Sequence, residues 1–510
     1  MAENYHIPEI IIKTVKTLTD NGFEAFLVGG CVRDLLLPAS QQGGHVKPKD
    51  WDITTNAKPE QIQKLFPKTV YENKFGTVAV INPPAMTSSG EVGRGENIED
   101  ETLKVIEITP FRLESKYSDK RHPDTISFTC NIEDDLKRRD FTINAMALNI
   151  VSHETIDLFD GQKDLKNKII KTVGKPEDRF NEDALRILRA VRLANELGFD
   201  VSHETKEAIK KQAHLLEIIA KERIRDEFVK IIMTDKPSEG IEIMRELGIL
   251  KFIIPELEDG YGVEQNQAHK FDVWKHNLLS LDHAAFKKWS LEIRLSALFH
   301  DIGKPLSRRW SEEKNDWTFY NHEVIGAKIV FRILSRLRFS KKTTELVAKL
   351  VRYHLFFSDT EKITLSAVRR TVRNVGPENV WDLMKVRFCD RIGMARPKET
   401  PYRLRKYEAM IDEAMRTPLS VNMLKIGGNR LMEILNIKPG PKIGQILHIL
   451  LEEVLDDAER NDKEWIEKRV KELGELDEKE LGKLSKQAKD KKDQLEWQEI
   501  SEIRQKWGVK

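Results

Sequence analysis

The pattern of apolar and polar positions along the chain changes near residue 176. Before that point, short runs rich in β-branched and aromatic residues stand between turn-forming segments. The run "FEAFLVGG" predicts a strand that ends in a glycine turn, and "CVRDLLL" predicts the helix that follows it. The runs "WDITT", "TVAVI" and "LKVIEITPF" predict three more strands. We therefore expect strands and helices to be mixed in the first 150 residues.

Beyond residue 176, apolar residues recur at spacings of three and four, which predicts helices almost throughout. The strongest examples are "EDALRILRAVRLANELGF", "RIRDEFVKIIM", "LSALFHDIG" and "AKIVFRILSRL". Proline and glycine clusters at 253–262 and 395–401 indicate boundaries within this helical part. From about Lys463 onward, lysine and glutamate dominate, which predicts a solvated helical or partly disordered tail.

Composition narrows the class of protein further. The 510 residues are 40% hydrophobic and 33% charged, with a net charge of +2, as in ordinary globular proteins of several domains. The three cysteines, Cys31, Cys130 and Cys389, are far apart, which argues against a disulfide framework and a zinc ribbon. No leader pattern opens the sequence and no apolar run is long enough to span a bilayer, so we expect a reducing cytoplasm.

Two aspartates in "PKDWDITT" are the first candidates for a metal site. In a strand, Asp50 and Asp52 point to one face while Trp51 points to the other. Adjacent carboxylates repel one another unless a cation lies between them, and Mg²⁺ is the cation that prefers carboxylate and phosphate oxygens. Metals held in this way activate an attacking hydroxyl and stabilise a leaving pyrophosphate. A solvated turn is the alternative interpretation of the same residues.

Three other segments have residues suited to phosphate and base recognition. Gly29 and Gly30 stand at a predicted strand-to-helix turn, where backbone N–H groups bind anions, and Arg33 follows in the first helical turn. A tight turn without a ligand is the alternative. The other two segments are "RRDFTINAMA" and "RFNEDALRILRAVR"; in the second, a three-residue spacing predicts that Asp183, Arg186 and Arg189 share one helix face. Surface ion pairs of little energetic value would give the same pattern.

Together, the segments "VGGCVRD", "KDWDIT", "RRDFTINAMA" and "EDALRILRAVR" resemble the signature motifs of the class II tRNA nucleotidyltransferase/poly(A) polymerase family, whose best-known members are CCA-adding enzymes. The resemblance covers residues 8 to about 462. It implies an α+β head of the polymerase-β nucleotidyltransferase type, with a mixed sheet, followed by all-α neck, body and tail regions. The 82–101 segment is a loop insertion relative to the compact family pattern, and 111–128 resembles the flexible loop of CCA-adding and A-adding members.

The resemblance also implies roles for individual residues. Asp50 and Asp52 would hold Mg²⁺, with Glu107 as a third catalytic acid. The expected nucleotide-binding residues are Gly29, Gly30, Arg33, Arg139, Asp140, Asn144, Asp183, Arg186, Arg189 and Arg192. Among these, Asp183 and Arg186 would read the base, because cytosine and adenine both present an amino donor beside a ring-nitrogen acceptor. Uracil and guanine present the reverse order, which leaves buried groups unsatisfied at a cost of about 1–3 kcal/mol each.

A second group of residues is suited to a metal with nitrogen ligands. His276, the pair His300–Asp301, and Asp390 resemble the H…HD…D ligand pattern of the HD phosphohydrolase superfamily. His322 and His354 match further ligands of its binuclear members. Nitrogen and carboxylate ligands suit Mn, Ni, Co or Fe, with Mg as another choice. A single histidine on a helix is usually structural, so this interpretation depends on the whole set.

With the resemblance, the expected domains are a nucleotidyltransferase head (1–150), a helical neck with the base-reading helix and an RNA-binding region (151–262), an HD domain (263–395), a helical tRNA-binding body and tail (396–462) and the charged tail (463–510). The expected function is addition of C and A to the 3′ end of tRNA from CTP and ATP, with HD-type phosphohydrolase activity. An A-adding enzyme or poly(A) polymerase is the alternative within the class. From other classes, an HD phosphohydrolase acting on nucleotides or RNA ends, and a non-catalytic RNA-binding protein, remain open.

Overall fold

The structure is a computed structural model that describes residues 6–37, 48, 50–71, 76–81, 103–114, 125–267, 269–356, 363–416 and 421–509. It divides into two compact units, the first made of Met1–Arg352 with Cys389–Ala395 and the second of Tyr353–Phe388 with Arg396–Lys510. Within the described residues, no helix combines the length and the apolar character that a membrane span requires. The insertion 82–101 and most of the 111–128 loop lie outside the described residues.

The first unit begins with a mixed sheet that has seven strands among the described residues, in the order β3-β4-β5-β2-β1-β8-β9. Only β2 and β5 run parallel; the other neighbours are antiparallel. The strands are β1 (Ala25–Val28), β2 (Asp52–Thr55), β3 (Thr69–Tyr71), β4 (Val78–Ile81), β5 (Val105–Pro110), β8 (Met146–Leu148) and β9 (Thr155–Asp157). The four strands predicted from the sequence correspond to β1, β2, β4 and β5.

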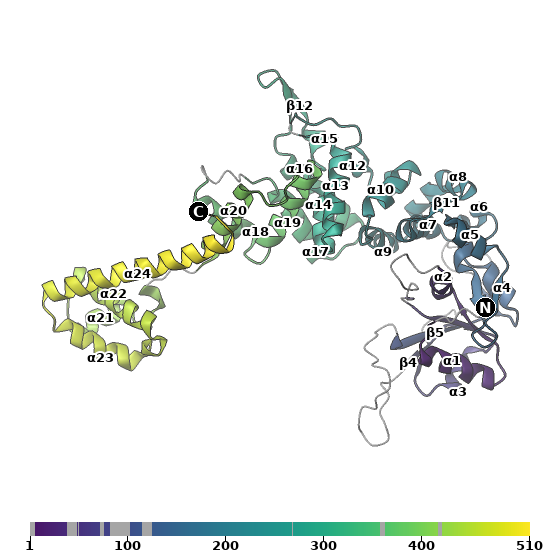
Figure 1. Cartoon of the computed structure of the whole chain (residues 1–510), viewed down its shortest axis with the longest axis horizontal. Coiled ribbons are helices and arrows are strands. Elements are labelled where there is room, and N and C mark those ends of the chain that lie inside the picture. The colour runs from purple at the N-terminus through teal and green to yellow at the C-terminus, as the bar shows by residue number, and fades with distance from the viewer. Residues whose placement is uncertain are drawn as a thin grey trace. The chain divides into compact units, whose positions relative to one another are not determined.

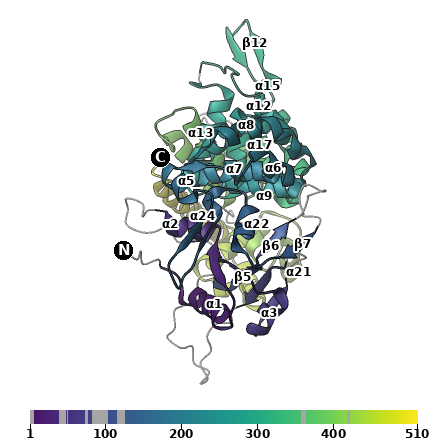
Figure 2. The same ribbon diagram turned by 90° about the vertical axis from the view of Figure 1, so that its right-hand side faces the viewer.

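Both faces of this sheet are covered, and β1 shows how alternation achieves this. Ala25 and Leu27 point into one apolar core, and Phe26 and Val28 point into another. The first core also holds residues of α1 (Glu9–Asp20), α2 (Gly30–Leu36) and α3 (Pro59–Leu65), and the second holds residues of α4 (Ile132–Lys137). Figures 1 and 2 show α1 and α3 beside β5. The predicted α+β head with a mixed sheet is confirmed.

The rest of the first unit is helical, with one continuous apolar core that extends from Phe141 to Val351. Its helices after the head are α5 (Gly161–Asn167), α6 (Pro176–Glu182), α7 (Leu185–Leu197), α8 (His203–Gln212), α9 (Lys221–Ile232), α10 (Pro237–Glu246), α11 (Leu250–Ile253), α12 (Pro255–Glu258), α13 (Val273–Phe286), α14 (Leu291–Phe299), α15 (Lys304–Ser307), α16 (His322–Arg336) and α17 (Lys341–Tyr353).

Three short two-stranded pairings accompany these elements: β6 (Arg112–Glu114) with β7 (Ile126–Phe128), β10 (Ile169–Ile170) with β11 (Asp200–Val201), and β12 (Arg309–Ser311) with β13 (Asp316–Thr318). The β12–β13 hairpin projects next to α15 (Figures 1 and 2). Helical periodicity alone did not predict it.

The second unit is also helical. Its elements are α18 (Leu365–Val375), most of α19 (Val380–Gly393), α20 (Tyr402–Met415), α21 (Gly428–Leu435), α22 (Pro441–Asp456), α23 (Lys463–Gly474) and α24 (Glu478–Lys506). The charged tail is thus two helices, and its few apolar residues, such as Ile466 and Leu481, pack into a core with α22. At the end of α24, the Trp507 ring stacks on Trp381 at 5.7 Å. The boundaries between the five expected domains stay a prediction.

Candidate active site and metal centre

The paired aspartates lie at the edge of β2 where it meets β5. Trp51 is only 3% exposed, whereas Asp50 is exposed, so the predicted alternation holds. β2 begins at Asp52, however, so Asp50 lies just before the strand and not within it. Asp52 is in register with Glu107 on parallel β5 and with Val28 on β1. The register gives Glu107 and Asp52 the same face of the sheet, so this face carries the acidic residues expected from the sequence.

Electrostatics at this edge favour a cation. Burial raises the pKa of the Asp52 carboxyl above its ordinary value, and the charge of Asp50 raises it further. The Arg139 guanidinium opposes the rise but does not cancel it. A divalent ion between these carboxylates would remove the repulsion, so their oxygen-only chemistry fits Mg²⁺.

The glycine turn brings backbone against this edge. Gly29 has φ +79°, in the left-handed region that favours glycine. A Cβ on Gly29 would lie 3.2 Å from Nη1 of Arg139 and 3.3 Å from Oδ2 of Asp52. The turn and the beginning of α2 at Gly30 therefore adjoin both the acidic edge and an arginine.

Two further predicted residues meet directly. Arg33, on α2, donates from Nη1 to Oδ1 of Asn144 at 3.0 Å and from Nε to Oδ1 of Asp34 at 2.8 Å. Asn144 is buried. The pair links the glycine turn to the "RRDFTINAMA" segment, two motifs that are more than 100 residues apart in the sequence.

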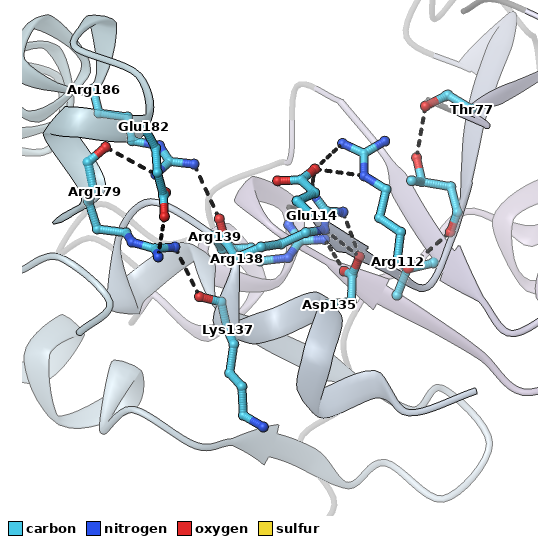
Figure 3. A network of polar contacts seen from close by, with 12 residues as sticks. Thr77, Arg112, Glu114, Asp135, Lys137, Arg138, Arg139, Arg179, Glu182 and Arg186 are labelled. Carbon is cyan, nitrogen blue, oxygen red and sulfur yellow. Dashed lines mark hydrogen bonds and ion pairs between the residues drawn. The ribbon is translucent and has the colours of Figure 1, made fainter. Parts of the chain in front are cut away.

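A buried ion network holds the arginines of that segment (Figure 3). Asp135 accepts from Nη2 of Arg138 at 2.5 Å and from Nη2 of Arg139 at 3.0 Å. Burial raises the pKa of the Asp135 carboxyl, but the two guanidiniums outweigh it and the net shift is downward. Arg138 also pairs with Glu114, which accepts from Arg112 at 2.8 Å. This network fixes the direction of Arg139, whereas Arg138 acts as its scaffold.

Asp140 is engaged within the protein. Its Oδ2 accepts from Nε and Nη2 of Arg189 at 2.7 and 2.6 Å, and its Oδ1 accepts from the Phe141 N–H at 2.9 Å. Burial raises the pKa of this carboxyl, yet Arg189 and Arg186 lower it overall. Arg189 thus holds the Asp140 carboxylate in place, and the role of both residues in nucleotide binding stays a prediction.

The helix face predicted for Asp183, Arg186 and Arg189 is wrong in one respect. Asp183 has φ −144° and ψ 104°, and it separates α6 from α7. Arg186 and Arg189 lie on α7, but Asp183 precedes the helix and accepts from the Leu185 N–H at 3.0 Å. Aspartate favours such helix-start positions over helix interiors, because its carboxylate binds free backbone N–H groups.

Arg192 lies apart from these residues. Its guanidinium donates to Glu227 at 2.7 Å and to Glu196 at 2.8 Å, which joins α7 to α9. The structure therefore places twelve of the expected head residues in two adjoining groups, and Arg192 instead makes a contact that joins α7 to α9. The two groups are the edge formed by Gly29, Gly30, Arg33, Asp50, Asp52, Glu107, Arg139 and Asn144, and the neck positions Asp140, Asp183, Arg186 and Arg189.

The histidine and aspartate set of the second motif converges in the first unit. His276 lies on α13, His300 and Asp301 follow α14, and Asp390 lies on α19. Nε2 of His276 is 2.9 Å from Nε2 of His300, 3.2 Å from Oδ2 of Asp301 and 3.4 Å from Oδ1 of Asp390. Nε2 of His300 is 3.4 and 3.8 Å from the same two oxygens. Ligand atoms about 2.1 Å from a metal lie roughly 3.0–3.4 Å from one another when they are adjacent in its coordination shell. Most of these distances are close to that range, and His276, His300 and Asp390 form one group that could hold an ion.

The protonation pattern of the rings supports the same conclusion. Nδ1 of His300 donates to the Ala297 carbonyl at 2.8 Å, and Nδ1 of His322 donates to the Phe319 carbonyl at 2.6 Å. Each ring therefore turns Nε2 toward Asp301, whose carboxylate oxygens lie 3.4 Å from Nε2 of His300 and 3.3 Å from Nε2 of His322. Burial alone would lower the pKa of His322, but its contact with the Asp301 carboxylate raises the pKa overall, so a proton or a metal ion is favoured at this nitrogen. Both domain types are metal-dependent, and this cluster has the donors that a metal needs.

Sequence reasoning missed three residues around the cluster. Lys304 is 5% exposed, and its Nζ lies 2.5 Å from Oδ2 of Asp301 and 2.5 Å from Oε1 of Gln265. His269 lies near His276 and Asp301 and could join them as a ligand. Burial and the charge of Lys304 lower the pKa of His269 to about 3, so its ring is neutral.

His354, which the sequence suggested as a further ligand, is buried directly after α17, in the second unit, and its role as a ligand stays a prediction.

Family models match three successive parts of the chain. The poly A polymerase head domain matches residues 25–171, the probable RNA and SrmB-binding site of polymerase A matches 198–260, and the HD domain matches 273–401. The head match contains the whole first group of head residues together with Asp140, and the HD match contains the core of the metal cluster. Asp183, Arg186 and Arg189 lie between the first two matches.

Relatives that align over most of the chain are CCA-adding enzymes. A CCA-adding enzyme of Ligilactobacillus salivarius (strain UCC118) is 34% identical over 465 residues, which are 90% of this chain and 95% of the relative. A CCA-adding enzyme of Lactococcus lactis subsp. lactis (strain IL1403) is 31% identical, over 92% of this chain and 98% of the relative.

The fold is likewise similar to that of the Bacillus stearothermophilus CCA-adding enzyme in complex with CTP, with a TM-score of 0.56 and 24% identity over 91% of this chain and 96% of the other. A CCA-adding enzyme in complex with ATP gives a TM-score of 0.51 at 20% identity, over 91% and 95%. The chain therefore belongs to the family of CCA-adding enzymes, which are tRNA nucleotidyltransferases.

Proposed function

We propose that the chain extends the 3′ end of tRNA with C and A, takes them from CTP and ATP, and performs the transfer at the edge where β2 meets β5. The observation that carries this proposal is the register of Asp52 with Glu107, beside the glycine turn and Arg139. The CTP and ATP complexes of the similar structures support the choice of nucleotides. The local excess of lysine and arginine between Arg396 and Lys442 supports tRNA as the partner.

In this proposal, Asp50, Asp52 and Glu107 hold Mg²⁺, which supplies activation of the terminal 3′-hydroxyl and neutralisation of the leaving pyrophosphate. The N–H groups of Gly29 and Gly30 orient the triphosphate, with Arg33 and Arg139 donating to its oxygens. Asn144 holds Arg33 in place. As the 3′-oxygen bonds to the α-phosphorus, pyrophosphate leaves with the displaced electron pair, and the hydroxyl proton passes to solvent or to a carboxylate of this edge.

The base is chosen by Asp183 and Arg186, one an acceptor and the other a donor. Asp140 and Arg189 support this pair: Asp140 orients Arg189 through a hydrogen bond, and the charge of Asp183 acts on the Arg189 guanidinium. Arg186→Ala should lower the preference for CTP and ATP over UTP and GTP more than it weakens tRNA binding. If the preference survives unchanged, base selection resides elsewhere.

The test of the main activity uses tRNA that ends before CCA and each labelled nucleotide separately. Incorporation of CTP and then ATP, with no extension by UTP or GTP, supports the proposal. Incorporation of ATP alone onto tRNA ending in CC would indicate an A-adding enzyme, and long adenylate products would indicate a poly(A) polymerase. Failure to incorporate any nucleotide would overturn the proposed transfer activity.

For the histidine cluster we propose a metal-dependent phosphohydrolase activity, carried by the spacing of His276, His300, Asp301 and Asp390. Histidine ligands favour Mn, Ni, Co or Fe over Mg at this site. The chemistry suits removal of a 2′,3′-cyclic or terminal phosphate from RNA ends, which would restore the 3′-hydroxyl that nucleotide addition requires. The test follows two reactions with each metal: opening of a 2′,3′-cyclic end to a phosphomonoester by one water, and release of phosphate from a terminal monoester by another. Neither reaction with any metal would make the cluster structural.

We also propose a reducing cytoplasm as the compartment. Cys31 and Cys389 are buried and Cys130 is exposed, and none of the three is in a disulfide within the described residues. Cysteines without disulfides agree with a compartment where disulfides do not persist. Fractionation with an antibody to the chain would test this location.

A further inference from the structure

The base-reading carboxylate has a partner that sequence reasoning did not find. Arg223, near the start of α9, donates from Nη2 to Oδ2 of Asp183 at 2.7 Å and from Nη1 to Oδ1 at 3.2 Å. The two residues are 40 positions apart, and both side chains are mostly shielded from solvent. A fork-shaped pair of this kind fixes the plane of the carboxylate as well as its position.

A count of acceptor positions shows what remains for a ligand. An ionised carboxylate offers about four lone-pair positions, two on each oxygen. Oδ1 of Asp183 uses both of its own, for Arg223 and for the Leu185 N–H. Oδ2 accepts only from Arg223 among the residues the structure describes. One position on Oδ2 is therefore left, which is what a single amino group of cytosine or adenine needs.

Arg186 is restricted in a matching way (Figure 3). Its Nη1 donates to Glu182 and to the Arg179 carbonyl, and its Nη2 donates to the Arg138 carbonyl at 3.2 Å. Of its five N–H groups, the Nε–H and one on Nη2 have no acceptor within the described part of the chain. Arg186 thus keeps donors for a ring nitrogen, while Asp183 keeps one acceptor for an amino group.

We propose that Arg223 is a positioning residue for nucleotide selection: it holds Asp183 so that a single lone pair faces the base. This inference rests on the proposed reading of the base by Asp183 and Arg186. With Arg223 in place, the carboxylate cannot turn away when uracil or guanine presents a carbonyl oxygen, so the repulsion is retained. Without Arg223 the carboxylate is free to rotate, and the wrong bases lose much of their penalty.

If the role of Arg223 were purely structural, its loss would lower the stability of the fold more than it changes nucleotide selection. α7 and α9 already pack through buried residues such as Leu188, Ile224 and Phe228, and Arg192 with Glu227 joins them a second time. The fold therefore does not depend on the Arg223 pair, and its loss should affect selection more than stability.

The experiment compares Arg223→Gln, Arg223→Lys and the control Arg225→Gln in the full-length chain. Arg225 is the matched control because it is two residues away and donates to Asp226 and the Arg338 carbonyl, not to Asp183. With tRNA lacking CCA, kcat and KM are measured separately for CTP, ATP, UTP and GTP, together with the melting temperature.

We expect Arg223→Gln to lower the ratio of kcat/KM for CTP over UTP, and for ATP over GTP, by about tenfold, the effect of one lost polar discrimination. Lysine restores charge without the fork, so Arg223→Lys should recover only part of the ratio. Arg225→Gln should leave it unchanged.

Equal losses for all four nucleotides in Arg223→Gln, or an unchanged ratio, would overturn the inference. Arg186→Ala, measured in parallel, separates the two levels. If Arg186→Ala lowers the ratio while Arg223→Gln does not, the role of Arg223 is wrong and the base-reading proposal stands. If neither variant changes the ratio, the base-reading proposal itself fails.

Discussion

The acidic edge of the head and the histidine cluster of the HD domain differ in their exposure to solvent and in the residues that would bind a cation. The head presents carboxylates at the end of a sheet, with Asp50 exposed and the guanidinium of Arg139 acting on Asp52. The HD cluster is closed: His276, His300 and Asp301 are at most 2% exposed, and Lys304 already neutralises Asp301.

The difference shows what each site is suited to do. An open carboxylate edge leaves room for a triphosphate and a primer end, and it binds its ion jointly with the substrate. A buried cluster with histidines binds its ion through the protein alone, with pH-dependent affinity. We therefore expect the two metals to be separable in chemistry and in experiment.

The largest expected effect is on the head. Asp52→Asn removes a metal-binding charge at the point where β1, β2 and β5 meet, and it should reduce nucleotide transfer by roughly 10³-fold or more, as losses of transition-state charge stabilisation do. The metal content of the HD site, measured by elemental analysis, should not change. Near-normal incorporation by this variant would contradict the assignment of the acidic edge.

The reciprocal change is His300→Ala with Asp301→Ala. Two of the four convergent ligands are lost, so the purified protein should lose its histidine-site metal and all metal-dependent phosphohydrolase activity. Addition of C and A should stay within about twofold of the unaltered chain, since the two sites share no residue. Loss of both activities would show that the sites are coupled.

At each of these two sites, some residues could be predicted from the sequence and others could not. Asp50 with Asp52, and His300 with Asp301, are local patterns whose spacing predicts a metal site. In the structure, Asp52 is in register with Glu107, and Nε2 of His300 lies 3.4 Å from Oδ2 of Asp301. Arg223, Lys304, Gln265 and His269 were missed because each acts across a distance in sequence that no local pattern encodes. His269 had a weak signal, seven residues before His276, which on its own is equally typical of a structural histidine.

The error over Asp183 has a different cause. The three-residue spacing in "EDALRILR" continues helical periodicity up to the aspartate, so pattern alone extends the helix. The carboxylate instead accepts the Leu185 N–H and ends that continuity. A helix-start preference of aspartate competes with periodicity at this position, and here it prevails.

The pH dependence of metal binding should separate the sites next. In the metal-free cluster, burial alone would lower the pKa of His276, but contacts with the carboxylates of Asp301 and Asp390 raise it to about 9. Below that pH the metal must displace a proton, so affinity should rise by about tenfold per pH unit up to pH 9. The carboxylate edge has no histidine ligand whose proton a metal must displace, so its metal affinity should change less over pH 7–9. Calorimetric titration of the Asp52→Asn and His300→Ala variants measures each site alone.

The smallest expected effect concerns Lys304. Its ammonium occupies the neighbourhood of Asp301 Oδ2 that a metal would share, so the two cations compete for one carboxylate. Lys304→Met keeps the buried stem and removes the charge, and it should raise metal affinity by about tenfold, or about 1.4 kcal/mol. The metal-free variant should melt several degrees lower, because Asp301 loses its buried partner, and saturating metal should restore most of the difference. Lys328→Met, an exposed lysine on α16, is the control and should change neither quantity. Weaker metal binding in Lys304→Met would mean that Lys304 supports the bound ion, and the contrast between an open edge and a site with its own counter-ion would then be wrong.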